Sequence, residues 1–190
     1  MKLQFRTLGI DDAPFKFKDK EVVVIGAVLR GKNYIEGVLR TSIKVDGKDA
    51  TNKLTKLIEK SRFREQIKAV FLDGIALGGF NIVDIKKLYK GTKMPVITVT
   101  RHKPDLEKIE LALRKHFRDW KARLKIIKST NIVEITTKHN PIYVGFEGVG
   151  LEDAKKLIAQ TTVRGVLPEP VRVAHLIACG VAKGESYGRA

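Results

Sequence analysis

Two aspartates stand where predicted strands end. Asp11 closes the run from Leu8, and Asp73 closes the run from Ala69 and precedes Gly74. If the two strands are neighbours, their carboxylates converge at the sheet edge where open α/β folds bind ligands. Converging carboxylates repel each other unless a cation lies between them, and Mg²⁺ or Mn²⁺ accepts such oxygen ligands. The pattern predicts a divalent-metal site; the alternative is that each aspartate only begins a turn.

The elements that carry Asp11 and Asp73 are predicted from alternation and spacing. Three strands come first, joined between the second and third by the turn Gly31-Lys32-Asn33. A helix with Leu54, Leu57 and Ile58 on one face follows, and then the strand that ends at Asp73. The three predicted strands are Leu8 to Asp11, Val22 to Ile25 and Val38 to Val45.

After Asp73, strands and helices alternate. One long helix is expected to open at Pro104-Asp105, because apolar residues recur every three or four positions as far as Leu124. The other expected elements are a helix near Val83 to Tyr89, a strand Pro95 to Val99, a β-ribbon Ile126 to Thr136, a strand Ile142 to Val144, and helices near Leu151 to Gln160 and Pro170 to Val181. This order favours an α/β fold of the ribonuclease H-like kind, with a mixed sheet in which a three-stranded antiparallel meander precedes β-α units and helices flank the sheet; other α/β folds share the order.

Three segments resemble endonuclease V and occur in the same order as in that family. They are Phe71 to Ala76, Met94 to Val99 and the run Leu167-Pro168-Glu169-Pro170-Val171-Arg172-Val173-Ala174-His175. The likeness extends from Gly9 to about Lys183, and the whole chain resembles an archaeal family related to that enzyme within the ribonuclease H-like nucleases. It implies one domain over residues 1–190. The prolines of the last run are expected to shape the start of the closing helix.

The resemblance implies roles for individual residues. Asp11 and Asp73 fall on the family's metal-binding aspartates. The family's middle acid follows a Pro-Tyr-x-Pro-Gly segment that is missing here. Asp49 is the nearest acid at the corresponding place. It is expected either to be a third metal ligand and catalytic residue or to be an ordinary helix N-cap. Arg101 stands in place of a lysine and keeps a cation for the phosphate. Gly148-Val149 replaces a Gly-His pair, which leaves Glu147 as the acid nearby.

The activity implied is hydrolysis of a phosphodiester near a deaminated base, with water activated on Mg²⁺ or Mn²⁺. Specificity for deaminated adenine is not implied, because it depends on the missing Pro-Tyr-x-Pro-Gly segment. Two other functions stay open: a nucleic-acid-binding module that has lost turnover, and a small-molecule phosphoesterase. The second of these is disfavoured because a small substrate does not require a strongly basic chain.

The charge favours a nucleic-acid partner, DNA or RNA. The chain has 37 Lys and Arg against 21 Asp and Glu, a net charge of +16. An ion-pair-rich thermophile surface needs matched signs, which are not present here, whereas an anionic membrane surface or an acidic protein is an alternative partner. Two groups are expected to contact nucleic acid: Arg101, His102 and Lys103, and a stripe on the long helix formed by Arg114, Arg118, Lys121 and Lys125. The alternative for the stripe is a solvated helix face.

The remaining residues indicate a cytoplasmic protein. Cys179 is the single cysteine, which excludes an internal disulfide. The start from Met1 to Arg6 carries no export signal, and the longest apolar run, Val22 to Leu29, is too short to span a bilayer. Of the four histidines, His175 is expected to pack in a buried helix, and His102 is the better functional residue.

Overall fold

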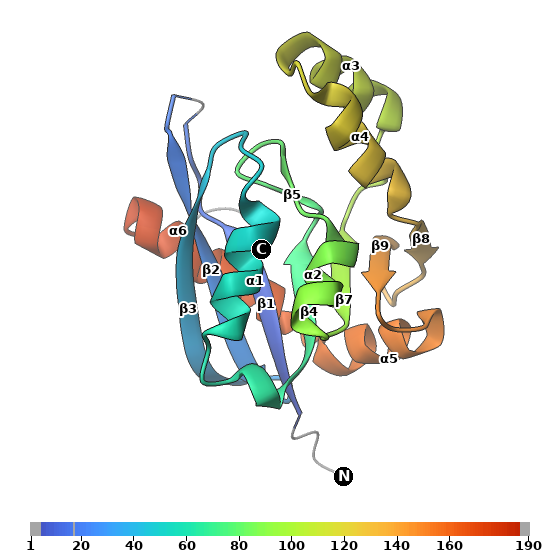
Figure 1. Cartoon of the computed structure of the whole chain (residues 1–190). Helices are drawn as coiled ribbons and strands as arrows, with labels where there is room; N and C mark the ends of the chain where they lie inside the picture. Colours follow the sequence, from blue (N-terminus) through green and yellow to red (C-terminus); the bar gives the residue numbers. More distant parts are fainter. Residues whose placement is uncertain (1–4, 17, 187–190) are drawn as a thin grey trace.

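The chain folds around a mixed sheet of seven strands, as seen in a computed structural model that describes residues 5–16 and 18–186 (Figure 1). Residues Met1 to Gln4, which belong to the segment predicted to lack an export signal, lie outside the described residues. The spatial order of the strands is β3-β2-β1-β4-β7-β9-β8. Their bounds are β1 Arg6–Asp12, β2 Glu21–Arg30, β3 Tyr34–Lys44, β4 Ile67–Asp73, β7 Val96–Thr100, β8 Ile132–Ile135 and β9 Ile142–Glu147.

The strand directions confirm the predicted fold class. β1, β2 and β3 form the antiparallel meander, and β4 and β7 continue the sheet parallel to β1. β9 is antiparallel to β7 and to β8. Between β4 and β7 the chain adds a short hairpin, β5 (Ala76–Leu77) and β6 (Asn81–Ile82). β1, β4 and β7 therefore end at one edge of the sheet, which is where both Asp11 and Asp73 stand.

Helices cover both faces of the sheet. In Figure 1, α1 (Ala50–Glu59) and α2 (Ile85–Thr92) lie in front of the strands, whereas α5 (Leu151–Thr161) and α6 (Glu169–Lys183) lie behind them. A short 3-10 helix, η1 (Arg64–Gln66), precedes β4. The central strands β1 and β4 are largely buried, and their apolar side chains contact helices on both faces. Within the described part of the chain, no helix is long and apolar enough to span a membrane.

The prediction of one long helix after Asp105 was wrong. The segment forms two helices, α3 (Leu106–His116) and α4 (Trp120–Ser129), because Phe117 is extended, with φ −129° and ψ 126°. The apolar spacing continues across the break since both helices pack on one cluster, to which Leu113, Leu124 and Ile127 belong. Figure 1 shows the two helices standing off one end of the sheet.

The predicted β-ribbon from Ile126 to Thr136 was also wrong in its first half. α4 continues to Ser129, and only Ile132–Ile135 forms a strand. Ile126 and Ile127 pack in the same cluster as Leu113, so burial on a helix outweighs the preference of β-branched residues for strands.

Candidate metal centre

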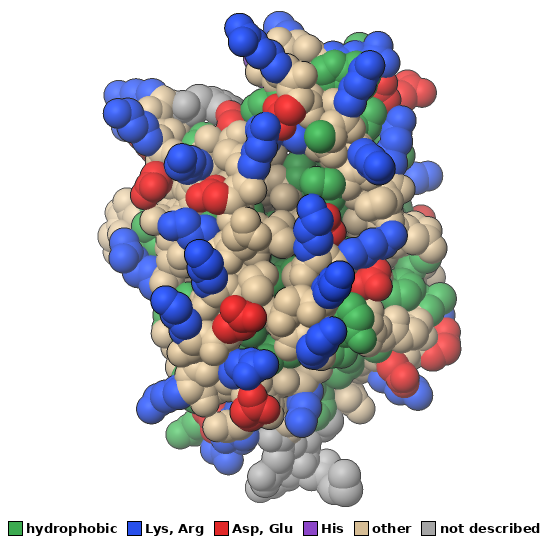
Figure 2. Space-filling model, in the orientation of Figure 1, with side chains coloured by type: hydrophobic (Ala, Val, Ile, Leu, Met, Phe, Trp, Pro, Cys, Tyr) green, Lys and Arg blue, Asp and Glu red, His purple; other side chains and the backbone are tan. Residues whose placement is uncertain are grey.

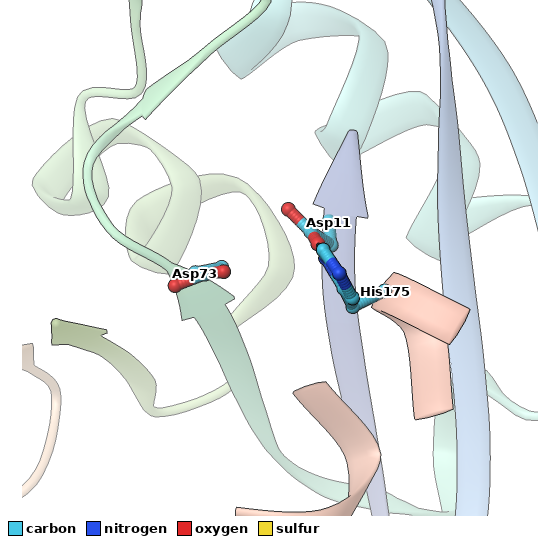
Figure 3. Close-up of side chains that lie close together, drawn as sticks. All are labelled: Asp11, Asp73 and His175. Atoms are coloured by element: carbon cyan, nitrogen blue, oxygen red, sulfur yellow. The ribbon is translucent and has the colours of Figure 1, made fainter. Parts of the chain in front are cut away.

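Asp11 and Asp73 come together because their strands are parallel neighbours. Ile10 of β1 is in register with Leu72 of β4, so the next residue of each strand is one of the two aspartates. Figure 3 shows their side chains beside that of His175, which comes from α6. One potential ligand atom from each of the three residues lies within 4.8 Å of the others. Ligands on one cation at about 2.1 Å are at most about 4.2 Å apart, so only a small closure separates this group from a coordination site.

α6 reaches this position through close backbone packing on β1. A Cβ on Gly9 would lie 2.0 Å from the carbonyl carbon of Pro170, so only glycine allows this approach. Pro168 and Pro170 stand at the start of the helix, as the sequence predicted for their run. His175 follows Pro170 by about one and a half turns, and its Nδ1 lies 2.8 Å from Asp11 Oδ2. The other ring nitrogen of His175 lies 3.5 Å from Sγ of the buried Cys179.

The two carboxylates of the group repel each other, and the nearby cations offset only part of that repulsion. Burial and the charge of Asp11 raise the pKa of Asp73 to about 6, although Arg101 and His175 oppose the rise. The hydrogen bond to Asp11 raises the pKa of His175, so Nδ1 is protonated more readily and donates to the Asp11 carboxylate. A divalent cation would offset both the burial and the repulsion that raise the pKa of Asp73. The two carboxylates and the imidazole fit Mg²⁺ or Mn²⁺, and the nitrogen donor is better suited to Mn²⁺.

Asp12 is a second acid at the end of β1, and it is partly buried. Burial and then the charge of Asp11 raise the pKa of Asp12 to about 7. Its Oδ2 accepts a hydrogen bond from the backbone N–H of Gly78, near the β5–β6 hairpin. Adjacent strand residues point to opposite faces, so Asp12 points away from the face that Asp11 shares with His175.

Asp49 is not part of the metal group. Its Oδ1 accepts hydrogen bonds from the backbone N–H of Lys44 and the side-chain amide of Asn81. It holds the N-cap position of α1 without making a side-chain capping bond. Because its carboxylate already anchors the loop between β3 and α1, the third donor beside Asp11 and Asp73 is His175 instead.

The three basic residues after β7 lie near the same sheet edge. Arg101 directly follows β7 and is half-buried. Its charge lowers the pKa values of Asp73 and His175, so the guanidinium acts on the metal group electrostatically. His102 and Lys103 are exposed. Glu147, by contrast, pairs with Val96 at the start of β7, the end remote from Asp73, and supplies no acid to the group.

The stripe on the predicted long helix is divided by the break at Phe117. Arg114 lies on α3, Lys121 and Lys125 lie on α4, and Arg118 lies in the turn between the helices; all four are exposed. Arg114 pairs with Glu110 and stacks on Trp120, with the guanidinium 4.6 Å from the ring centroid. The four charges therefore surround the helix junction and do not form a line on one helix.

Sequence reasoning missed His175 as a member of this group. Its apolar neighbours predicted a packing role, and part of its ring does pack on Cys179. The available signal was its position, one turn beyond Pro170 in the segment most specific to the family resemblance. A helix that begins tightly against β1 carries a side chain one or two turns later to the end of that strand.

Comparisons with known proteins agree with this geometry. Residues 3–182 match the family described as endonuclease dU. The chain belongs to the endonuclease dU family. UPF0215 proteins of Methanosarcina barkeri and Methanothermobacter thermautotrophicus are 48% and 42% identical to it, each aligned over the whole chain and over 97% and 94% of the relative. The crystal structure of a protein of unknown function from Archaeoglobus fulgidus superposes on this chain with a TM-score of 0.84 at 41% identity. The superposition covers 97% of this chain and 100% of that one.

Endonuclease V shares the fold at lower identity. The enzyme of Ciona intestinalis, solved with a DNA containing inosine, superposes with TM-score 0.58 at 15% identity over 90% of this chain and 83% of its own. Human endonuclease V gives 0.58 at 14% identity over 92% and 83%. This endonuclease dU family member thus has the fold of endonuclease V, and the description of its family supports a nuclease-like function on nucleic acid.

Proposed function

We propose that this endonuclease dU family member hydrolyses phosphodiester bonds in nucleic acid with the help of a divalent metal. The observation that carries the proposal is the convergence of ligand atoms of Asp11, Asp73 and His175 to within 4.8 Å at the ends of two parallel strands. Mg²⁺ or Mn²⁺ held there would lower the pKa of bound water and stabilise charge on the phosphate. The family's description makes a strand containing deoxyuridine the first substrate to test.

The chain's own residues have distinct parts in this proposal. Asp11 and Asp73 provide the charged ligands, and Arg101 provides a permanent cation for the scissile phosphate. His175 either joins the ligands or keeps its proton on Nδ1 and holds the Asp11 carboxylate in place, as in the structure. An arginine stands where the family has a lysine, so this position can supply a cation but not the neutral base that a lysine can become.

The test is cleavage of matched oligonucleotides that contain deoxyuridine, inosine or only unmodified bases, with Mg²⁺ or Mn²⁺. We expect metal-dependent cleavage that the Asp11→Asn and Asp73→Asn variants each reduce by at least about a hundredfold, as expected when a ligand is lost. Asp49→Asn is the control, since its carboxylate lies outside the group and its bonds to Lys44 and Asn81 serve the loop. Absence of cleavage together with absence of millimolar metal binding would refute the hydrolase.

A nucleic-acid-binding module without turnover is the second candidate. Two observations favour it: Val149 stands where the related enzyme has histidine, and Asp49 supplies no third carboxylate. In that case the double variant Asp11→Asn, Asp73→Asn binds oligonucleotides as tightly as the wild type, and no substrate is cleaved. A cytosolic location is part of both proposals and accords with a free, buried Cys179.

A further inference from the structure

A groove of about 1000 Å³ lies between the β8–β9 hairpin and the C-terminal end of α5, outside the metal group. Its apolar part includes Ile135 and Ile158, which pack in one cluster with Val171 of α6. The groove therefore lies on the side of the sheet that α5 and α6 cover, and α6 also carries His175. The segment Val163 to Val166 lines the groove and leads directly into the start of α6.

The charge of the groove is strongly unbalanced. Glu134 is the single carboxylate among the lining residues, whereas four lining side chains are cationic. These are Lys32, Lys138, Lys155 and Arg164. Lys155 is paired with Glu152, but within residues 5–16 and 18–186 the other three have no carboxylate within ion-pair distance. Three unneutralised cations around one cavity attract a ligand with several negative charges.

The geometry points to this groove as a second binding site, one that holds the sugar-phosphate backbone of the nucleic-acid strand whose scissile bond lies at the metal group. The inference rests on the proposed function. The exposed Val163, above the largely buried Ile135 and Ile158, would face the sugars and base edges. Lys32, Lys138 and Arg164 would neutralise phosphates. A strand fits the observations better than an acidic peptide because a regularly spaced polyanion can bind the groove and the metal group together.

The distance between the two sites sets the strand length. Glu169 to His175 spans about 9 Å of helix, and the stretch from Val166 to Glu169 adds at most about 10 Å when extended. Stacked as in one strand of a duplex, at about 3.4 Å per phosphate, a strand covers this path with roughly six phosphates at most, and an extended strand needs fewer. We therefore expect a 15-nucleotide single strand to occupy both sites.

The first experiment measures binding of a fluorescent 15-nucleotide strand by anisotropy in EDTA over a series of salt concentrations. The variant is Lys32→Gln, Lys138→Gln, Arg164→Gln. The control is Lys56→Gln, Lys86→Gln, Lys90→Gln, with the same change in charge. These are exposed positions on α1 and α2, the helices in front of the sheet in Figure 1. We expect the groove variant to lower the slope of log affinity against log salt by about 2, since each single-strand phosphate contact contributes about 0.7. Equal effects of the two triple variants would overturn the inference.

The second experiment maps contact directly. Val163→Cys in the groove and Val181→Cys on α6 are 56% and 57% exposed as valines, so both accept a thiol-linked photocrosslinker equally well. The wild type, with only the buried Cys179, gives the background. We expect crosslinks to the 15-nucleotide strand from position 163 above those from position 181. Equal yields at the two positions would count against the groove even if cleavage occurs. A strand bound in the groove but never cleaved would overturn the hydrolase and leave the groove site standing.

Discussion

At the scale of single residues, the metal group depends on two carboxylates whose mutual repulsion is only partly offset by Arg101 and His175. The pKa of Asp73 is raised to about 6 chiefly by burial and next by Asp11. A cation can bind well only when Asp73 is ionised, so proton and metal compete for one site. The competition gives a measurable pH dependence that does not require catalysis.

We expect Mn²⁺ affinity, measured by calorimetry, to fall as the pH decreases through about 6. Below that pKa the loss should approach tenfold per pH unit, because one proton must leave Asp73 for each metal bound. Protonation of His175, whose pKa is also raised, acts in the same direction. Asp73→Asn should bind weakly at every pH and show a flatter profile. An affinity that stays constant from pH 5 to 8 in the wild type would contradict this account of the site.

Asp12 gives a prediction about stability. Its pKa is about 7 in the folded chain against an ordinary value of 3.8, so the folded state favours the protonated form. Asp12 therefore favours folding at low pH, and that contribution is lost as the pH rises towards about 7. Asp12→Asn keeps an acceptor for the Gly78 N–H and removes the charge. In EDTA, the melting temperature of the variant should exceed that of the wild type more at pH 8 than at pH 5.

The matched control for Asp12 is Asp153→Asn. Asp153 is 69% exposed and pairs only with Lys156 on the surface, so its removal should shift the melting temperature little at either pH. If Asp12→Asn and the wild type show parallel curves against pH, the burial of Asp12 does not have the inferred effect.

At the scale of elements, the position of α6 determines whether His175 reaches Asp11. Gly9→Ala would place a methyl group against the backbone of Pro170, where no side-chain rotation can relieve the clash. We expect a loss of at least about 2 kcal/mol in unfolding free energy and weaker Mn²⁺ binding, because α6 must shift. Gly180→Ala on the same helix is the control: nothing lies within 4 Å of its added Cβ, and alanine favours the helix. Equal behaviour of the two variants would contradict the close-packing argument.

Strands and their order could be predicted because alternation and β-branched runs depend on local sequence. The break at Phe117 could not be predicted, because it depends on contacts distant in the chain. Arg123 of α4 donates hydrogen bonds to the carbonyls of Asp46, Gly47 and Phe80, and its guanidinium stacks on Phe117. The position of α4 relative to α3 therefore follows from tertiary contacts that helical spacing does not show.

The candidate site could also be predicted only in part, because some of its residues are positioned by contacts distant in the chain. Asp11 and Asp73 were predictable since a strand's end is visible in sequence and parallel neighbours bring such ends together. His175 was not, because its role depends on how closely α6 approaches Gly9. Asp49 was assigned to the metal site because an acid before a helix gives the same sequence pattern in three different roles. It can bind a metal, cap the helix or, as here, accept a hydrogen bond from the side chain of Asn81.

At the scale of the whole molecule, the net charge of +16 is widely distributed. Figure 2 shows Lys and Arg side chains over the whole face in front of the sheet, with acids among them. Total charge accounts for attraction to nucleic acid but not for where the strand lies. Basic residues differ in how much they contribute to binding because their neighbours differ. A cation already paired with a carboxylate neutralises less phosphate charge and so releases fewer counterions from the nucleic acid.

The helix junction offers a direct comparison of two such cations. Arg114 is paired with Glu110 and stacked on Trp120, whereas Arg118 is exposed in the turn and forms no ion pair among the described residues. If the junction contacts the strand, Arg118→Gln should lower the salt slope of binding by about 0.7, and Arg114→Gln should lower it less, because its charge is partly neutralised by Glu110. Anisotropy with the 15-nucleotide strand measures both slopes, and Lys90→Gln on α2 sets the effect of removing one remote charge. A slope for Arg118→Gln equal to that of Lys90→Gln would place the strand away from α3 and α4 and make their basic side chains a solvated surface.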